Sequence, residues 1–358
     1  MPNNPKNNYN SIAKALGIIL MVIGHSGCPV SLSKFLYIFH MPLFFICSGF
    51  FFKEITDLNS FSSVFQKRVK KLYLPYLKWS IAVLLLHNLF CKLYIMPGTQ
   101  YSLSDYVRQF VKLVTMTDYE LLIRPFWFIK ELFYASIIVA FVSMLCHRYF
   151  PKIKPEMLLI AALLATIAAK YVSPLPLIGD LSVMTFAIAY FYSGVLFQKY
   201  KNHIRMTYPV LILSFLIVVV GVITYSGTVD MRFTTALSTI SYYLLSISGV
   251  IMTFCLANKI ELLPGKSFWY YIGNHTMPIL ALNLIALKIG SIIKIWLYDL
   301  PIESLSSHTV IYEHNTYFWI FYAIIGTTVP LLIDYIYHRL IIHTKNGAQK
   351  MKICSCAK

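Results

Sequence analysis

Two ionisable side chains, Lys14 and His25, interrupt the first long apolar stretch of the chain. On an α-helix, this spacing places them about 20° apart around the axis and about 16 Å apart along it. Inserting an ionisable residue into a membrane span costs roughly 2.5–3.5 kcal/mol, so such residues usually indicate function. One interpretation is a cation near one membrane surface, aligned with an imidazole deeper in the bilayer. The alternative is a lysine that reaches lipid phosphate and a histidine bonded to a neighbouring helix.

A second histidine, His40, lies in the next apolar stretch, two residues before Pro42. Proline bends a helix and frees a backbone carbonyl, which membrane proteins tolerate where other groups satisfy that carbonyl. The small pair Ser48-Gly49 lets another helix approach closely. We therefore expect His40 at a bend that faces a cavity, or else a hydrogen-bonded histidine at a packing kink.

A basic segment follows, with five lysines and arginines between Lys53 and Lys71. Arg68 and Lys71 stand at helical spacing and lead directly into a third apolar stretch. Such side chains bind phosphate through charge-assisted hydrogen bonds, although runs of charge are usually only solvated. Two interpretations are open, a grip on the phosphates of a cytoplasmic ligand and a simple topology signal.

The composition indicates which elements position these side chains. Hydrophobic residues make up 58% of the 358 residues and charged residues 13%, whereas soluble chains have about 45–50% and 25%. The apolar runs are longer than the roughly ten alternating residues of a membrane β-strand. The sequence therefore predicts an all-α, polytopic membrane helical bundle, with a membrane domain over 9–340 and a basic cytoplasmic tail over 341–358.

A membrane-crossing helix needs about 20 residues, and ten stretches of the chain are candidates. They lie near 11–27, 34–52, 73–95, 126–147, 156–173, 180–198, 208–226, 235–257, 272–290 and 318–338. Of the 31 lysines and arginines, 19 fall on the same side as the N-terminus and 5 on the other. This asymmetry predicts that both termini are cytoplasmic. It also explains most of the net charge of +17 without nucleic acid as a partner.

The sequence predicts no metal site. The seven cysteines have neither metal-ligand spacing nor the arrangement of a disulfide framework. His25 and His40 fall on different predicted spans, without an acidic residue at ligand spacing.

Several of these segments together resemble the acyltransferase-3 family. The first two are Lys14 with His25, and the stretch His40-Met-Pro-Leu-Phe-Phe-Ile-Cys-Ser-Gly49. The others are Arg68-Val-Lys-Lys-Leu-Tyr-Leu-Pro75-Tyr76, Pro125-Phe-Trp127 through Glu131, Ser193-Gly194 and Tyr271-Ile-Gly273-Asn274-His275. The resemblance covers roughly residues 9–340, and the stretch from His40 to Gly49 is its most specific part.

The resemblance implies a ten-span O-acyltransferase of the bacterial cytoplasmic membrane. Its donor is acyl-CoA, with acetyl-CoA expected, and its acceptor is a surface glycan or lipid-linked sugar outside the cytoplasm. Lys14, Arg68 and Lys71 would hold the phosphates of the coenzyme. His25 would act as general base or carry the acyl group, and His40 would orient or assist.

The resemblance also assigns Glu131, near Trp127, to the acceptor hydroxyls. The sequence departs from the family pattern at Asn283, where many members carry a histidine. Two other functions remain as alternatives. One is a transporter or flippase that uses the intramembrane lysine and histidines as a relay, and the other is a structural subunit for glycan export.

Overall fold

The structure is a computed structural model that describes residues 9–172, 180–225, 229–314 and 316–355. Within that part of the chain the fold is helical and contains no strand. Six helical stretches are long and apolar enough to cross a membrane, and three shorter apolar helices accompany them. These findings confirm the all-α membrane bundle, whereas the count of ten spans stays a prediction.

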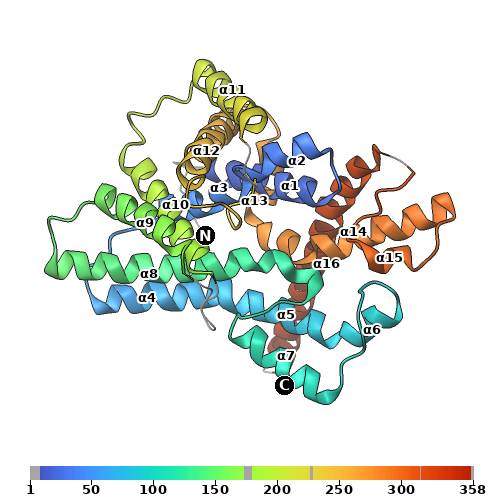
Figure 1. Cartoon of the computed structure of the whole chain (residues 1–358). Helices are drawn as coiled ribbons and strands as arrows, with labels where there is room; N and C mark the ends of the chain where they lie inside the picture. The colour runs from blue at the N-terminus through green and yellow to red at the C-terminus, as the bar shows by residue number, and fades with distance from the viewer. Residues whose placement is uncertain (1–8, 173–179, 226–228, 315, 356–358) are drawn as a thin grey trace.

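The helices follow one another along the chain with short connections (Figure 1). Their bounds are α1 (Tyr9–His25), α2 (Val30–Tyr37), α3 (His40–Phe50), α4 (Leu58–Arg68), η1 (Val69–Tyr73), α5 (Leu74–Leu85), α6 (His87–Lys92), α7 (Leu103–Val114), η2 (Leu121–Phe126), α8 (Trp127–Tyr149), α9 (Pro155–Ala169), α10 (Leu181–Lys199), α11 (Tyr208–Thr224), α12 (Thr239–Glu261), α13 (Lys266–Asn274), α14 (Thr276–Tyr298), α15 (Ser304–Ser307) and α16 (Phe318–Ser355).

Helix α1 lies at the centre of the bundle. It packs against α3, α12, α13, α14 and α16, which cover it from several sides (Figure 1). Ile12, Ala13, Ala15 and Val22 are fully buried as a result. A helix surrounded in this way holds its polar side chains inside the protein, and Lys14 and His25 are on this helix.

The second predicted span is broken into α2 and α3. Ile38 and Phe39 form the break, and α3 starts at His40. Pro42 explains the position, because its ring nitrogen has no hydrogen to donate to the carbonyl four residues earlier, that of Ile38. The expected bend is therefore present one turn before the proline, and His40 lies directly after it.

The basic segment forms one continuous helical rod. Asp57 caps the start of α4, accepting a hydrogen bond from the Ser60 backbone at 2.8 Å. After Arg68 the rod widens into the π-helical turn η1 and continues as α5, which has Pro75 in its first turn. The predicted span 73–95 is not a single helix, because α5 ends at Leu85 and the short α6 follows.

Two further boundaries differ from the prediction. The helix expected over 272–290 begins after a break at His275 and continues to Tyr298, which shortens the following outer loop. The helix expected over 318–338 continues to Ser355, so the basic tail is helical for most of its length.

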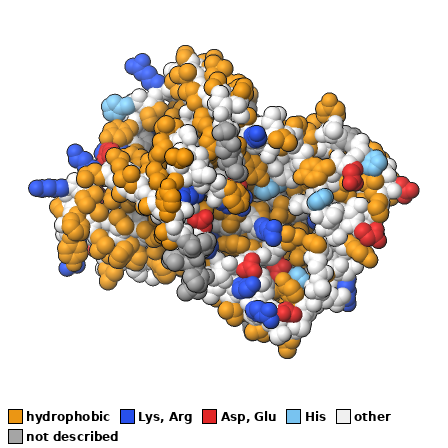
Figure 2. Space-filling model, in the orientation of Figure 1, with side chains coloured by type: hydrophobic (Ala, Val, Ile, Leu, Met, Phe, Trp, Pro, Cys, Tyr) orange, Lys and Arg blue, Asp and Glu red, His pale blue; other side chains and the backbone are white. Residues whose placement is uncertain are grey.

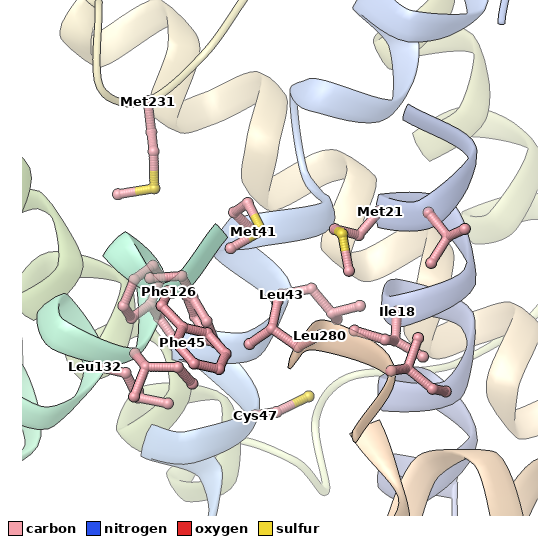
Figure 3. Close-up of a cluster of buried hydrophobic side chains, with 14 of the residues drawn as sticks. Ile18, Met21, Met41, Leu43, Phe45, Cys47, Phe126, Leu132, Met231 and Leu280 are labelled. Carbon is pink, nitrogen blue, oxygen red and sulfur yellow. The ribbon is translucent and has the colours of Figure 1, made fainter. Parts of the chain in front are cut away.

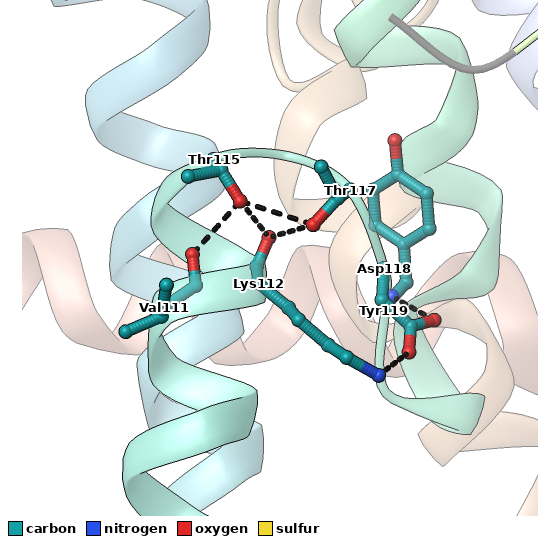
Figure 4. A network of polar contacts seen from close by, with 6 residues as sticks. All are labelled: Val111, Lys112, Thr115, Thr117, Asp118 and Tyr119. Carbon is teal, nitrogen blue, oxygen red and sulfur yellow. Dashed lines mark hydrogen bonds and ion pairs between the residues drawn. The ribbon is translucent and has the colours of Figure 1, made fainter. Parts of the chain in front are cut away.

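The first long predicted loop, 96–125, contains the amphipathic helix α7 and a polar turn after it (Figure 4). Lys112 Nζ lies 3.0 Å from Asp118 Oδ2, and the Thr115 hydroxyl donates to the Val111 carbonyl at 2.9 Å. These contacts hold together the turn that follows α7.

The surface in Figure 2 shows hydrophobic side chains covering much of the region formed by α4 and α8–α11. Lysine and arginine side chains project from the left rim, where the ends of those helices lie, whereas both signs of charge gather near α5–α7 and α15. A broad apolar surface between charged ends is typical of a protein that lies in a bilayer.

Candidate functional site

The basic rod and α1 together line a cavity of about 600 Å³. We call it the donor cavity, after the ligand that the sequence resemblance predicts. Five cations line it, and no acidic residue among the described residues does. These cations are Lys14, Lys53, Lys67, Arg68 and Lys71. Such a concentration of positive charge is suited to a ligand with several phosphates.

The basic side chains around the π-helical turn η1 point to different sides of the rod. Arg68 and Lys71 line the donor cavity, whereas Lys70 lines a separate groove between α5, α14 and α16. Turns of this kind often mark functional sites. Arg68 and Lys71 thus border the same cavity, and Lys14 joins them from α1; their binding of phosphate stays a prediction.

Arg68 is held in place by the second predicted span. Its Nη1 lies 3.3 Å from the Ser48 hydroxyl oxygen of α3. The adjacent Gly49 packs against the backbone of α10 at Phe191 and Gly194, where a Cβ atom would overlap the chain. The pairs Ser48-Gly49 and Ser193-Gly194 thus meet at one helix crossing, where α3 packs closely against α10.

His25 and His40 lie together in a second, much smaller space, the histidine pocket. Its free volume is about 20 Å³, which suffices for about one water molecule. The Tyr37 ring meets both imidazoles edge-on, with ring centroids 6.3 Å from His25 and 4.9 Å from His40. The Tyr242 hydroxyl donates to the Tyr37 carbonyl at 2.8 Å and holds this residue in place.

His40 uses one ring nitrogen to satisfy the broken helix. Its Nδ1 lies 2.7 Å from the Leu36 carbonyl oxygen, and a carbonyl only accepts hydrogen bonds. Nδ1 therefore carries a proton, which leaves Nε2 as the acceptor of the neutral ring. A neutral imidazole with a free acceptor nitrogen is suited to take a proton from a hydroxyl group.

Asp230 and Arg232, from the loop between α11 and α12, complete the histidine pocket. Arg232 Nη2 lies 2.6 Å from Asp230 Oδ2, and its Nε is 3.1 Å from both carboxylate oxygens. The guanidinium group also lies 4.8 Å from the ring centre of Trp127. Neither residue was identified from the sequence, because no local pattern indicates that this loop folds over the histidines.

One stripe of α1 connects the two spaces. Lys14, Ile18 and Met21 line the donor cavity, while Met21 and His25 line the histidine pocket. The spacing-based prediction that Lys14 and His25 share a helix face is therefore confirmed. A ligand held by the cations can reach toward the imidazoles along this face.

The comparison with known families agrees with this arrangement. Residues 7–335 match the family model Acyl_transf_3, described as an acyltransferase domain. The chain belongs to the acyltransferase-3 family. No curated protein and no solved structure matches this acyltransferase significantly. The family and the apolar helices together make the protein a multi-pass membrane acyltransferase.

Glu131 of this acyltransferase lines neither the donor cavity nor the histidine pocket. It is 6% exposed, and its Oε2 has no hydrogen-bond partner among the described residues. Trp127, one turn before it, does line the histidine pocket. Trp127 therefore contributes to the histidine pocket, whereas the Glu131 carboxylate is buried outside both spaces.

Other ionisable residues of the acyltransferase form contacts away from these two spaces. His87 Nδ1 lies 3.0 Å from Glu120 Oε2, and its ring stacks on Tyr101. Lys288 donates to the Leu305 carbonyl and, at 2.8 Å, to the His308 carbonyl. In the part of the chain that the structure describes, no group of His, Cys, Asp or Glu side chains could hold a metal ion.

Proposed function

We propose that the protein is an O-acyltransferase. It transfers an acyl group, which we expect to be acetyl, from acyl-CoA to a sugar hydroxyl outside the cytoplasm. The acceptor is a surface glycan or a lipid-linked sugar. The observation that carries the proposal is the common lining of the two spaces: the donor cavity with five cations borders the pocket with two histidines.

In this proposal the cations bind the coenzyme. Lys14, Arg68 and Lys71 hold its phosphates at the cytoplasmic side of the cavity, and Lys53 and Lys67 add positive charge. The pantetheine arm then extends along the Lys14–His25 face of α1. A span of about 16 Å separates these two residues along the helix, a distance that an extended pantetheine arm can cover.

The chemical step is acyl transfer by a general base. His25 takes the proton of the acceptor hydroxyl as its oxygen attacks the thioester carbonyl carbon, which forms a tetrahedral intermediate. The carbon–sulfur bond then breaks, the carbonyl reforms, and the thiolate of CoA takes the proton from the imidazolium. His40 orients the acceptor or assists, while Glu131 affects the site through its neighbour Trp127 on the same helix.

The protein lies in a bacterial cytoplasmic membrane with both termini in the cytoplasm, in agreement with the distribution of lysine and arginine. In that orientation the donor cavity faces the supply of acyl-CoA. The alternative of a transporter or flippase is less well supported, because the family match is to an acyltransferase.

His25→Gln tests the proposed function, since glutamine keeps polarity but takes no proton. A general base contributes about 10²–10⁴-fold, so a strain that carries only this variant should lose nearly all acyl groups from its surface glycan. Mass spectrometry of the released glycan measures this loss. The purified variant should still bind acyl-CoA like the wild type. Wild-type levels of acylation in the variant would reject His25 as the base.

A further inference from the structure

Three buried apolar side chains, Met21, Met41 and Leu280, line both the donor cavity and the histidine pocket. They come from α1, α3 and α14 and are 1%, 8% and 5% exposed. Figure 3 shows them near the middle of the apolar cluster, with Cys47 on one side and Met231 on the other. We call these three residues the septum, because they separate the cations from the imidazoles.

The free space differs greatly between the two sides of the septum. About 600 Å³ lies on the side of the cations, and about 20 Å³ lies on the side of the histidines. Any group that a donor presents to His25 must therefore fit at the septum itself or in a space the size of a water molecule.

The proposed donor would place its acyl chain at this point. The pantetheine arm occupies the route from the cations to the septum, and an extended thioester directs its acyl chain away from that arm. The carbon atoms beyond the carbonyl thus meet Met21, Met41 and Leu280. Each further methylene has to displace packed side chains, which is unfavourable in a filled apolar region.

We propose that Met21, Met41 and Leu280 determine the acyl-chain length of the donor and restrict it to two or three carbons. This inference rests on the proposed function and names the specificity of the same site. The septum excludes longer chains because only about 20 Å³ of free space lies behind it. Methionine is flexible, so the wall yields enough for a short acyl group to reach the imidazoles.

Shortening the septum side chains tests the inference. Met21→Ala and Met41→Ala each remove three heavy atoms, which leaves room for about two extra methylenes. The full-length protein in detergent or nanodiscs is tested for binding of free CoA and of acetyl-, propionyl-, butyryl- and hexanoyl-CoA by competition. A buried methylene contributes about 0.8 kcal/mol, or about fourfold in affinity. The affinity for butyryl-CoA relative to acetyl-CoA should therefore rise on the order of tenfold in both variants.

Met277→Ala is the matched control. Met277 lines the donor cavity but not the histidine pocket, so its loss should leave the ratio of butyryl-CoA to acetyl-CoA affinity unchanged. A variant that no longer binds free CoA is replaced by Met21→Val or Leu280→Val, which remove less volume. The same ratio is then measured, and a smaller rise is expected.

The other outcomes separate this inference from the proposed function. If the wild type binds acyl-CoA but the ratio changes in neither septum variant, or changes equally in Met277→Ala, the septum does not select chain length and the inference is overturned. The proposed donor would then still stand. If the wild type binds none of the CoA compounds, the proposed function fails, and this inference fails with it.

Discussion

Arg232 and Asp230 form a bidentate ion pair in the pocket that holds His25 and His40, with Nη2 and Oδ2 2.6 Å apart. The Asp230 side chain is only 12% exposed, while the Arg232 side chain is 35% exposed. The pair lines the histidine pocket with charged groups of both signs, and neither residue lines the donor cavity. Under the proposed function, we expect an acceptor that reaches His25 to contact this pair.

Removing the guanidinium group should impair acyl transfer while leaving donor binding intact. Arg232→Ala leaves the Asp230 carboxylate without its partner, and breaking a buried ion pair costs about 3–5 kcal/mol. This pair is partly exposed, so the cost should be lower, but the pocket wall next to His25 should shift. We expect at least about a tenfold loss of glycan acylation, since an effect above about 1.4 kcal/mol corresponds to tenfold. Acyl-CoA affinity should stay unchanged.

Arg108→Ala serves as the control for this prediction. Arg108 pairs with Asp105 on α7, but its side chain is 68% exposed and distant from the pocket lining. Its removal should leave acylation at the wild-type level. If Arg232→Ala also retains wild-type acylation, the ion pair has no part in transfer.

Cations that line the donor cavity should contribute to acyl-CoA binding, whereas a neighbouring cation outside it should not. Lys14→Ala and Arg68→Ala should each lower the affinity for acyl-CoA about tenfold or more, since hydrogen bonds to charged groups contribute about 1.5–3 kcal/mol. Lys70→Ala should have little effect, because Lys70 lines a different groove. Competition binding on the purified variants measures all three. Equal losses in the three variants would mean that only the overall charge of the segment matters.

The sequence predicted the parts of the site that depend on local periodicity. The common face of Lys14 and His25 follows from helical geometry alone, and the break near His40 follows from Pro42. Arg68 and Lys71 were placed together because they lie one turn apart. In each case the relationship spans one to three turns of a single helix, so no tertiary information was needed.

Other features depended on tertiary packing. Asp230 and Arg232 reach the histidines only because their loop folds over α8, and nothing in the loop itself indicates that position. The π-helical turn that contains Lys70 and Lys71 also has no sequence signature, so their separate surroundings could not be predicted. Glu131 was expected at the acceptor side with Trp127, but the packing around α8 buries it away from both spaces.

The crossing of α3 and α10 should be sensitive to a single methyl group. A Cβ atom on Gly49 would overlap the backbone of Phe191, and backbone cannot rotate away as a side chain can. Gly49→Ala should therefore destabilise the protein by about 3 kcal/mol, the upper part of the usual range for overpacking. Thermal unfolding in detergent measures the effect as a lower midpoint.

Gly221→Ala is the comparison for this prediction. A Cβ atom there would meet only the flexible end of the Leu245 side chain, which can move. The midpoint should fall less than in Gly49→Ala. Equal changes in the two variants would show that α3 and α10 are not packed as closely as the structure indicates.

The orientation in the membrane can be tested by cysteine labelling. In a variant without native cysteines, Glu303→Cys should react with a membrane-impermeant maleimide in intact cells, since residue 303 is predicted to lie outside. Lys152→Cys should react only after the membrane is permeabilised, because it lies in a basic loop on the predicted cytoplasmic side. Labelling of Lys152→Cys in intact cells would reverse the orientation and place the donor cavity on the wrong side for acyl-CoA.

The two ring nitrogens of His40 are expected to have different roles, one in stabilising the helix break and the other in acyl transfer. Nδ1 donates to the Leu36 carbonyl at the helix break, and Nε2 remains free as an acceptor. Asparagine places an amide nitrogen near the position of Nδ1, whereas glutamine places its amide nearer to Nε2. The two substitutions therefore remove different parts of the imidazole.

His40 shares a pocket with His25, so we expect Nε2 to contribute to acyl transfer. His40→Asn should then fold with a near-normal unfolding midpoint but lose at least about tenfold in glycan acylation. This loss is smaller than the roughly hundredfold minimum for a general base, because His40 assists His25. His40→Gln should lose the Leu36 hydrogen bond and unfold at a lower temperature, since such a bond contributes about 1 kcal/mol. Thermal unfolding and mass spectrometry of the glycan are measured on the same two variants. Normal acylation by His40→Asn would show that His40 only supports the helix break, which would leave His25 as the single imidazole that acts in transfer.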